Sequence, residues 1–472
     1  MKATFTLLTL GSLFSLTVSL GQPKLPNILL LCVDDLRPEL ACYGKDYIHS
    51  PHIDQLAEKG SLFRKHYVNA PSCGPSRYTL LTGRYGPVSN NALFQRAEQY
   101  NKNPHQIPPT MSEWFRQHGY TTVSVGKVSH HPGGWGGADW GDVDQVEIPN
   151  AWNEQLMPVG TWKHPRGAMH GLANGEIRTV AGEMEVYQSV AGPDTLYPDG
   201  LIVSEGLNQL KQLASDKKPF MLAIGLIKPH LPFGAPKKYL DLYQDTKLPP
   251  IHHPDQPQHK TTWHKSGEFM KYNRWGRDPR EDEAFAQDVR VYYAAFVSYT
   301  DHHVGLILNE LKKLNIDETT IVVLWGDHGW HLGEHAIWGK HSLFEEALHA
   351  PLMIAYPGNK KSGKPIDEIV ETLDVFPTLC ELAGIAIPDF TQGKSLLPLL
   401  EKQDKSKHAA IAYKGKAKTI RTEQYRLILH QDGFVELYDH ESNEKETKNI
   451  AQNKPDVVKK LKELMAVKLQ KR

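Results

Sequence analysis

Short runs of apolar residues, each bounded by polar residues, recur along the chain and predict the strands of a sheet. They span residues 28–33, 121–125, 220–227, 321–325 and 352–356. Between them lie patterns with helical spacing, at residues 52–59, 109–118, 200–214 and 301–314. Continuous apolar strands that alternate with helices are typical of a parallel sheet covered on both faces. The predicted fold class is therefore α/β, with a large, mostly parallel sheet flanked by helices.

The pattern changes after about residue 393. Short β-prone segments with tight polar turns follow, at residues 409–413, 418–422, 425–430 and 435–438, and residues 456–470 form an amphipathic basic pattern. The segments predict a small antiparallel sheet, and the basic pattern predicts a helix with a solvated face. We therefore expect an N-terminal α/β domain over residues 22–395 and a C-terminal α+β subdomain over residues 396–472.

Residues 1–21 predict a secretory signal peptide, because a basic residue precedes an apolar stretch that ends in small residues. The stretch is too short and too poorly flanked for a membrane span, and no later stretch reaches that length. We expect an exported protein, periplasmic or secreted. The four cysteines are too few for a disulfide framework, although a bridge between Cys32 and Cys42 stays open.

Charge composition argues against a nucleic-acid partner. Lysine plus arginine and aspartate plus glutamate both number 54 in the 472 residues, so the formal net charge is zero. No long-range field for a polyanion arises from such a balance. Any attraction for anions must therefore be local.

Polar side chains follow four of the apolar runs. They are Asp34 and Asp35 after the first run, Lys127 and His130 after the second, His230 after the third, and Asp327 and His328 after the fourth. In an open parallel sheet, ligands bind outside the carboxyl ends of the strands. One such pair alone could merely cap a helix or form a turn. The agreement of four distant segments predicts a functional site at one edge of the sheet.

Cys73 opens the run Cys-Gly-Pro-Ser-Arg, which ends at Arg77 and looks like the motif that converting enzymes read to oxidise a cysteine to formylglycine. The hydrated aldehyde carries two hydroxyls on one carbon, so one can attack and the other can later expel the product. Pro75 suits the first turn of a helix, whose N-terminus favours an anion such as sulfate. A buried structural thiol is the alternative, but glycine, proline, serine and arginine are poor core residues.

From Pro26 to the end, the chain resembles the type I, formylglycine-dependent sulfatases of the alkaline-phosphatase superfamily. The resemblance rests on residues 73–77, 126–128, 228–233, 327–330 and 332–335, and it is greatest for iduronate-2-sulfatase and bacterial polysaccharide sulfatases. It implies a sulfuric ester hydrolase that acts on a sulfated carbohydrate, such as a uronate or hexose O-sulfate of a polysaccharide or oligosaccharide. It also implies a partner that installs the aldehyde, either a formylglycine-generating enzyme or a maturase.

The same resemblance assigns roles to individual residues. One divalent cation would be surrounded by Asp34, Asp35, Asp327, His328 and the modified Cys73. Three carboxylates favour calcium, while the histidine leaves magnesium open.

The basic residues also receive roles from the resemblance. Arg77 and Lys127 would hold the diol, and His130 would remove the proton from its second hydroxyl. His230 and Lys340 would grip the sulfate and protonate the departing sugar oxygen. His131 could exchange roles with His130.

Two irregular stretches, residues 131–198 and 229–285, are rich in tryptophan or charge and are expected to form the rim of the site. Their indoles suit sugar rings, although buried tryptophans that pin a surface loop would give the same pattern. Two other functions stay open. One is a formylglycine-dependent phosphonate monoester or phosphodiester hydrolase, and the other is a secreted glycan-binding protein in which Cys73 remains a thiol.

Overall fold

The computed structural model describes residues 25–134, 139–142, 144–180, 182–359, 362–401 and 408–470. The predicted signal peptide at residues 1–21 lies outside them. Among the helices described, none combines the length and the apolar character that a membrane crossing requires. All four cysteines are free thiols, so the possible bridge between Cys32 and Cys42 is not formed.

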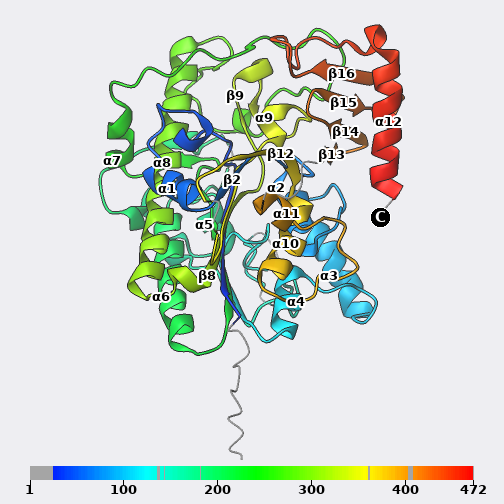
Figure 1. The fold of residues 1–472 in the computed structure, drawn as a ribbon. Coiled ribbons are helices and arrows are strands. Elements are labelled where there is room, and N and C mark those ends of the chain that lie inside the picture. The colour runs from blue at the N-terminus through cyan, green and yellow to red at the C-terminus, as the bar shows by residue number, and fades with distance from the viewer. Residues whose placement is uncertain are drawn as a thin grey trace, which may run out of the picture.

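An eight-stranded sheet lies at the centre of the molecule, in the order β12-β2-β11-β8-β1-β6-β3-β4 (Figure 1). The strands are β1 (Asn27–Val33), β2 (Ser61–Tyr67), β3 (Thr121–Gly126), β4 (Glu154–Leu156), β6 (Phe220–Leu226), β8 (Thr320–Gly326), β11 (Leu352–Ala355) and β12 (Ile366–Glu371). Strand β1 pairs in parallel with β6 and β8, and β3 pairs in parallel with β6. Of the eight, β11 alone runs against the others. The predicted mostly parallel sheet is confirmed.

Alternate residues of β1 pack into different hydrophobic clusters, which explains the uninterrupted apolar run. Leu29 and Leu31 share a cluster with residues of α1 (Pro51–Lys59), α6 (Pro198–Ser215) and α8 (Glu283–Lys313). Ile28 and Leu30 belong to a second cluster with residues of α2 (Cys73–Thr82), α4 (Met111–Gln117) and α10 (Val375–Leu382). Figure 1 shows these two groups of helices on opposite faces of the sheet. Because the strand is covered on both faces, it lacks the alternation of apolar and polar residues that a half-exposed strand shows.

Helix α8 is much longer than the pattern predicted. It begins at Glu283 instead of residue 301, and the Asp282 side chain caps it by accepting a hydrogen bond from the Phe285 N–H at 2.9 Å. Its first half buries Val289 and Tyr293 against the core. The prediction stopped short because this half follows a charged, irregular segment.

The predicted C-terminal sheet is also confirmed. Strands β13 (Ala410–Lys414), β14 (Ala417–Arg421), β15 (Tyr425–Leu429) and β16 (Val435–Asp439) form an antiparallel sheet in that order. Helix α12 (Pro455–Gln470) buries Leu461 and Met465 in the cluster that also contains Leu427 of β15. Strand β13 is tied to the segment before α2, because Asn69 donates to the Ile411 carbonyl at 2.7 Å. This contact brings the C-terminal sheet close to Cys73, while the boundary at residues 395 and 396 stays a prediction.

The remaining elements are short or lie in the connections. The helices are α3 (Ala92–Lys102), α5 (Pro165–Met169), α7 (Lys237–Leu240), α9 (Glu345–Leu348) and α11 (Leu397–Leu400). Two-residue strands pair β5 (Tyr187–Gln188) with β7 (Phe233–Gly234), and β9 (His331–Leu332) with β10 (Trp338–Gly339).

Candidate functional site

The carboxyl ends of β8, β1, β6 and β3 lie side by side, since these strands are consecutive neighbours in the sheet. Asp34 and Asp35 follow β1, and Asp327 follows β8 directly. Asp35 adopts a left-handed backbone conformation with φ of 57°, and its N–H donates to Asp327 Oδ1 at 3.0 Å. The two loops are therefore joined at the position that the sequence predicted.

Cys73 is the first residue of α2 and is 2% exposed. Its Sγ lies 3.3 Å from His328 Nε2 and 3.4 Å from Lys340 Nζ. Burial and the nearby Asp34 raise the pKa of the thiol well above its usual value, although two lysines oppose this. An unmodified thiol here stays protonated at neutral pH and is a poor nucleophile.

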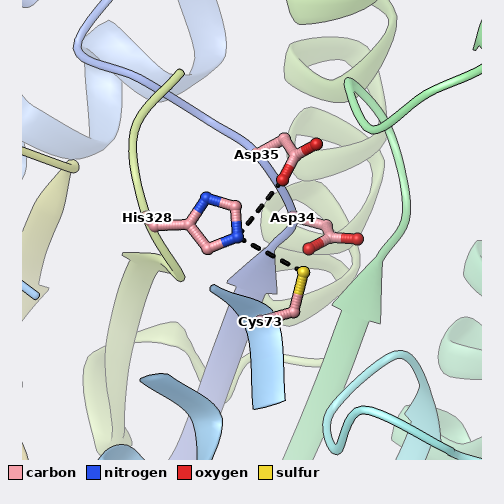
Figure 2. A group of neighbouring side chains, drawn as sticks. All are labelled: Asp34, Asp35, Cys73 and His328. Carbon is pink, nitrogen blue, oxygen red and sulfur yellow. Dashed lines mark hydrogen bonds and ion pairs between the residues drawn. The ribbon is translucent and has the colours of Figure 1, made fainter. Parts of the chain in front are cut away.

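Asp34, Asp35, Cys73 and His328 form a group that could hold a metal ion, as Figure 2 shows. Their donor atoms all lie within 4.8 Å of one another. Burial and the neighbouring carboxylates raise the pKa of Asp35 well above its usual value, although the Lys340 ammonium opposes this. Buried carboxylates are hard oxygen ligands, and the residues present therefore fit a divalent cation.

Asp327, which was predicted as a further ligand, lies beside this group. Its Oδ1 is 3.6 Å from His328 Nε2, and its Oδ2 accepts a hydrogen bond from Arg77 Nε at 3.1 Å. Arg77 is fully buried, and its guanidinium also contacts Asp34 Oδ1 at 3.3 Å. Lys127 forms an ion pair with the other oxygen of Asp34. The guanidinium thus holds two of the predicted ligands in place.

A cavity of about 640 Å³ opens over Cys73. Five of the predicted catalytic residues line it, namely Cys73, Lys127, His130, His230 and Lys340. Its wall also contains side chains from both irregular stretches and from β13, among them Trp140, His170, Arg178, His264, Glu268, Lys271 and Lys414. The expected rim is confirmed, and it is predominantly basic.

Tryptophans of the first irregular stretch differ in their roles. Trp140 lines the cavity. Trp162 is 1% exposed, and its indole N–H donates to the Leu172 carbonyl at 2.8 Å. One of these two tryptophans therefore faces the cavity, and the other pins a loop.

His130 and His131 are adjacent in the sequence, but their side chains have different roles in the structure. His131 is held by Glu147. Oε1 of Glu147 lies 3.1 Å from the ring atom His131 Nδ1, and its Oε2 accepts a hydrogen bond from the backbone N–H of His131 at 2.6 Å. His130 is the member of the pair that lines the cavity. Burial and the Lys127 ammonium lower the pKa of His130 well below its usual value, so its imidazole is neutral at neutral pH.

Glu268 is a cavity residue that the sequence did not reveal. Its Oε1 lies 3.6 Å from His230 Nε2 and 3.7 Å from Lys340 Nζ, and its Oε2 lies 3.5 Å from His341 Nε2. Burial opposes its ionisation, but Lys340 and the two histidines hold the pKa of Glu268 well below its usual value. The residue follows no strand and belongs to no recognisable motif, so its place in an irregular stretch was the one available signal.

Comparison with known proteins gives a consistent result. The Sulfatase family model matches residues 26–385, and the model for the N-sulphoglucosamine sulphohydrolase C-terminal region matches residues 333–471. A sulfatase of Formosa agariphila is 32% identical over 448 residues, which cover 91% of this chain and 83% of the relative. Iduronate 2-sulfatase of Mus musculus is 32% identical over 414 residues, covering 77% of this chain and 69% of the relative.

Solved structures agree with the fold. A protein in complex with its substrate D-glucosamine-2-N,6-O-disulfate has a TM-score of 0.71 at 21% identity, covering 95% of this chain and 98% of that one. Phosphonate monoester hydrolase of Agrobacterium radiobacter has a TM-score of 0.73 at 20% identity, covering 95% and 96%. At these identities the likeness concerns the fold alone.

Proposed function

Because the chain belongs to the sulfatase family and is a sulfuric ester hydrolase, we propose that its substrate is a sulfate ester on a carbohydrate. The preferred substrate is a uronate or hexose O-sulfate of a sulfated polysaccharide or oligosaccharide. The observation that carries this proposal is the basic cavity of about 640 Å³ over Cys73. Its volume exceeds the needs of a sulfate group alone, and Trp140 in its wall offers an apolar face to a sugar ring.

We propose that Cys73 is converted to formylglycine by a formylglycine-generating enzyme or a maturase. One hydroxyl of the hydrated aldehyde loses its proton and attacks the sulfur, and the bond from sulfur to the sugar oxygen breaks as that oxygen is protonated. The second hydroxyl then loses its proton, the bond from carbon to the sulfate oxygen breaks, and sulfate leaves as the aldehyde re-forms. Water hydrates the aldehyde again for the next cycle.

The cavity residues supply the proton transfers and the charges for these steps. Lys340 and His230 hold the sulfate oxygens and protonate the departing sugar oxygen, which is a poor leaving group without an acid. His130, which lines the cavity with Cys73 and is kept neutral by its lowered pKa, accepts the proton of the second hydroxyl. Lys127 holds the diol, and Arg77 acts through the two aspartates that it contacts. Electrostatic stabilisation of the transferred group is expected to be the largest contribution to the rate.

Asp34, Asp35, Asp327, His328 and the modified Cys73 would hold one divalent cation. Calcium is the preferred ion because the ligand set is dominated by carboxylates, and magnesium is the alternative. When bound, the cation offsets negative charge on the sulfate and lowers the pKa of the nucleophile. We also propose export to the periplasm or beyond through residues 1–21, with the site formed mainly by residues 22–395 and completed by the subdomain at residues 396–472.

The decisive experiment examines position 73 in protein produced together with a converting enzyme. Mass spectrometry of the peptide that contains Cys73 should show formylglycine, and Cys73→Ala should abolish turnover of a sulfated oligosaccharide while Cys42→Ala retains it. EDTA should remove the activity, and calcium should restore it better than magnesium. Recovery of the thiol alone, without turnover, would instead favour a glycan-binding protein.

Paired assays decide between ester classes. The phosphonate monoester hydrolase neighbour shares the fold, so sulfate and phosphate esters of the same alcohol should be compared at equal enzyme concentration. Faster hydrolysis of phosphodiesters would refute the proposed substrate class. The enzyme could hydrolyse simple aryl sulfates and no member of a panel of sulfated oligosaccharides. That result would refute the proposed carbohydrate substrate.

A further inference from the structure

A second group of histidine and glutamate side chains lies apart from the catalytic cavity, between the segment after β8 and the C-terminal sheet. His335, Glu346 and Glu446 each offer one donor atom, and these atoms lie within 4.8 Å of one another. His335 precedes β10, Glu346 belongs to α9, and Glu446 follows β16. The residues that line the catalytic cavity include none of the three. Parts of the chain more than 100 residues apart thus converge on one point.

His331 of β9 adds a fourth donor. Its Nδ1 lies 3.9 Å from Glu346 Oε2, and His335 Nε2 lies 3.8 Å from the same oxygen. The other nitrogen of His331 is hydrogen bonded to Ser342 Oγ at 2.7 Å. When His331 Nε2 carries the proton and donates it to Ser342, the lone pair of Nδ1 is directed at Glu346. A hydrogen bond of this kind to the distal nitrogen is what orients metal-binding histidines.

Several polar atoms of this group are buried without a hydrogen-bond partner. They are His331 Nδ1 and Glu346 Oε2, which face each other, and His335 Nδ1, which is not the ring nitrogen that faces Glu346. His331 is 0% exposed and His335 is 2% exposed, so water does not solvate these rings from outside. Buried polar atoms are nearly always paired, and an unpaired one calls for an explanation such as an ion.

The charges around the group also leave a place for a cation. Arg426 and His440 pair with Glu446, at 2.5 Å and 3.1 Å, whereas the contacts of Glu346 within ion-pair distance are with the two histidines.

We propose that His331, His335, Glu346 and Glu446 bind a divalent transition metal, with zinc as the preferred ion. Two imidazoles and two carboxylates suit zinc, which accepts four ligands in a tetrahedral arrangement. Zinc bonds of about 2.0–2.1 Å place neighbouring ligand atoms about 3.3 Å apart. The group therefore needs to contract from 3.8–3.9 Å between the two histidines and Glu346 Oε2, and from separations of up to 4.8 Å among His335, Glu346 and Glu446. The bound ion would connect the segment around β9 and α9 to the C-terminal sheet. Its role is therefore structural and independent of the proposed carbohydrate substrate.

The test measures zinc in the full-length chain with the catalytic metal group weakened by Asp34→Asn. After dialysis in calcium buffer, elemental analysis should find one zinc ion per chain in this variant and in its derivative with His252→Gln, an exposed histidine outside the group. Addition of Glu346→Gln should weaken zinc binding by at least about tenfold, the typical loss when metal coordination is disturbed. Zinc should also raise the melting temperature of the Asp34→Asn variant, but not that of the variant that combines Asp34→Asn with Glu346→Gln.

Two results would overturn the proposal. One is the absence of bound zinc from the Asp34→Asn variant, and the other is equal zinc affinity with and without Glu346→Gln. If the variant that combines Asp34→Asn with Glu346→Gln does not fold, X-ray absorption of the zinc-loaded Asp34→Asn chain identifies the ligands of the ion. Two imidazole nitrogens with carboxylate oxygens around the ion support the site, and a sulfur ligand or an all-oxygen shell contradicts it.

Discussion

Replacement of Glu268 by glutamine tests how the cavity controls its own charge. The substitution keeps the shape of the side chain and removes one negative charge. In the native cavity this carboxylate lies 3.6 Å from His230 Nε2 and 3.7 Å from Lys340 Nζ. Burial and the Lys340 ammonium already hold the pKa of His230 well below its usual value, while Glu268 opposes this shift. Removal of the Glu268 charge should therefore lower the pKa of His230 further.

The expected size follows from the distance. Two unit charges about 4 Å apart near a protein surface interact by about 4 kcal/mol. The Glu268 side chain is 29% exposed, and solvent screening reduces this to about 2 kcal/mol, or about 1.5 pKa units for His230. If protonated His230 assists departure of the sugar oxygen, kcat should fall by about 10- to 50-fold at neutral pH. KM should stay constant or fall, because a negative charge near the bound sulfate has been removed.

The assay is the pH dependence of kcat and KM on one sulfated oligosaccharide, with matured enzyme. In Glu268→Gln the alkaline limb of the kcat profile should move to lower pH by about 1.5 units. Glu281→Gln, which changes an exposed glutamate in the same irregular stretch, is the matched control and should leave both constants unchanged. An unshifted profile with kcat within twofold of the native value, in a folded variant, would refute this account of the cavity.

Three further predictions concern stability and proton transfer. Arg77→Met should lower the free energy of unfolding in urea by about 3 kcal/mol or more, because two buried aspartates lose their guanidinium; a loss below about 1 kcal/mol would contradict this. Burial lowers the pKa of His66 to about 3, so its contribution to stability is complete above pH 6.5 and declines as the pH falls toward 3. At pH 5 the loss should be about 2 kcal/mol, and His66→Gln should flatten this part of the stability profile. His130→Gln should lower kcat by about 100-fold, whereas His131→Gln, compared at equal folded fraction, should have the smaller effect; the reverse order would assign the base to His131.

Much of the fold could be predicted because the apolar runs of the central strands are continuous. Strands β1, β3, β6, β8 and β11 end within one residue of the predicted bounds. Strands β2 and β12 were missed, since charged residues such as Arg64 and Lys65 in β2, or Asp367 and Glu368 in β12, interrupt their apolar pattern. Their place in the sheet comes from pairing with each other and, for β2, with β11. Such pairing is a long-range interaction that a local pattern does not encode.

The sequence by itself determined which chemical groups are present, because Cys73 lies in a recognisable motif and the acids and bases follow predictable strands. Parallel strands end at one edge, so a local pattern was sufficient to bring Asp35 and Asp327 together. Only the tertiary structure decided that His130 lines the cavity while its neighbour binds Glu147, and that Glu268 from an irregular stretch joins the site. These outcomes depend on how loops pack over the sheet, and packing is set by contacts between residues far apart in the chain.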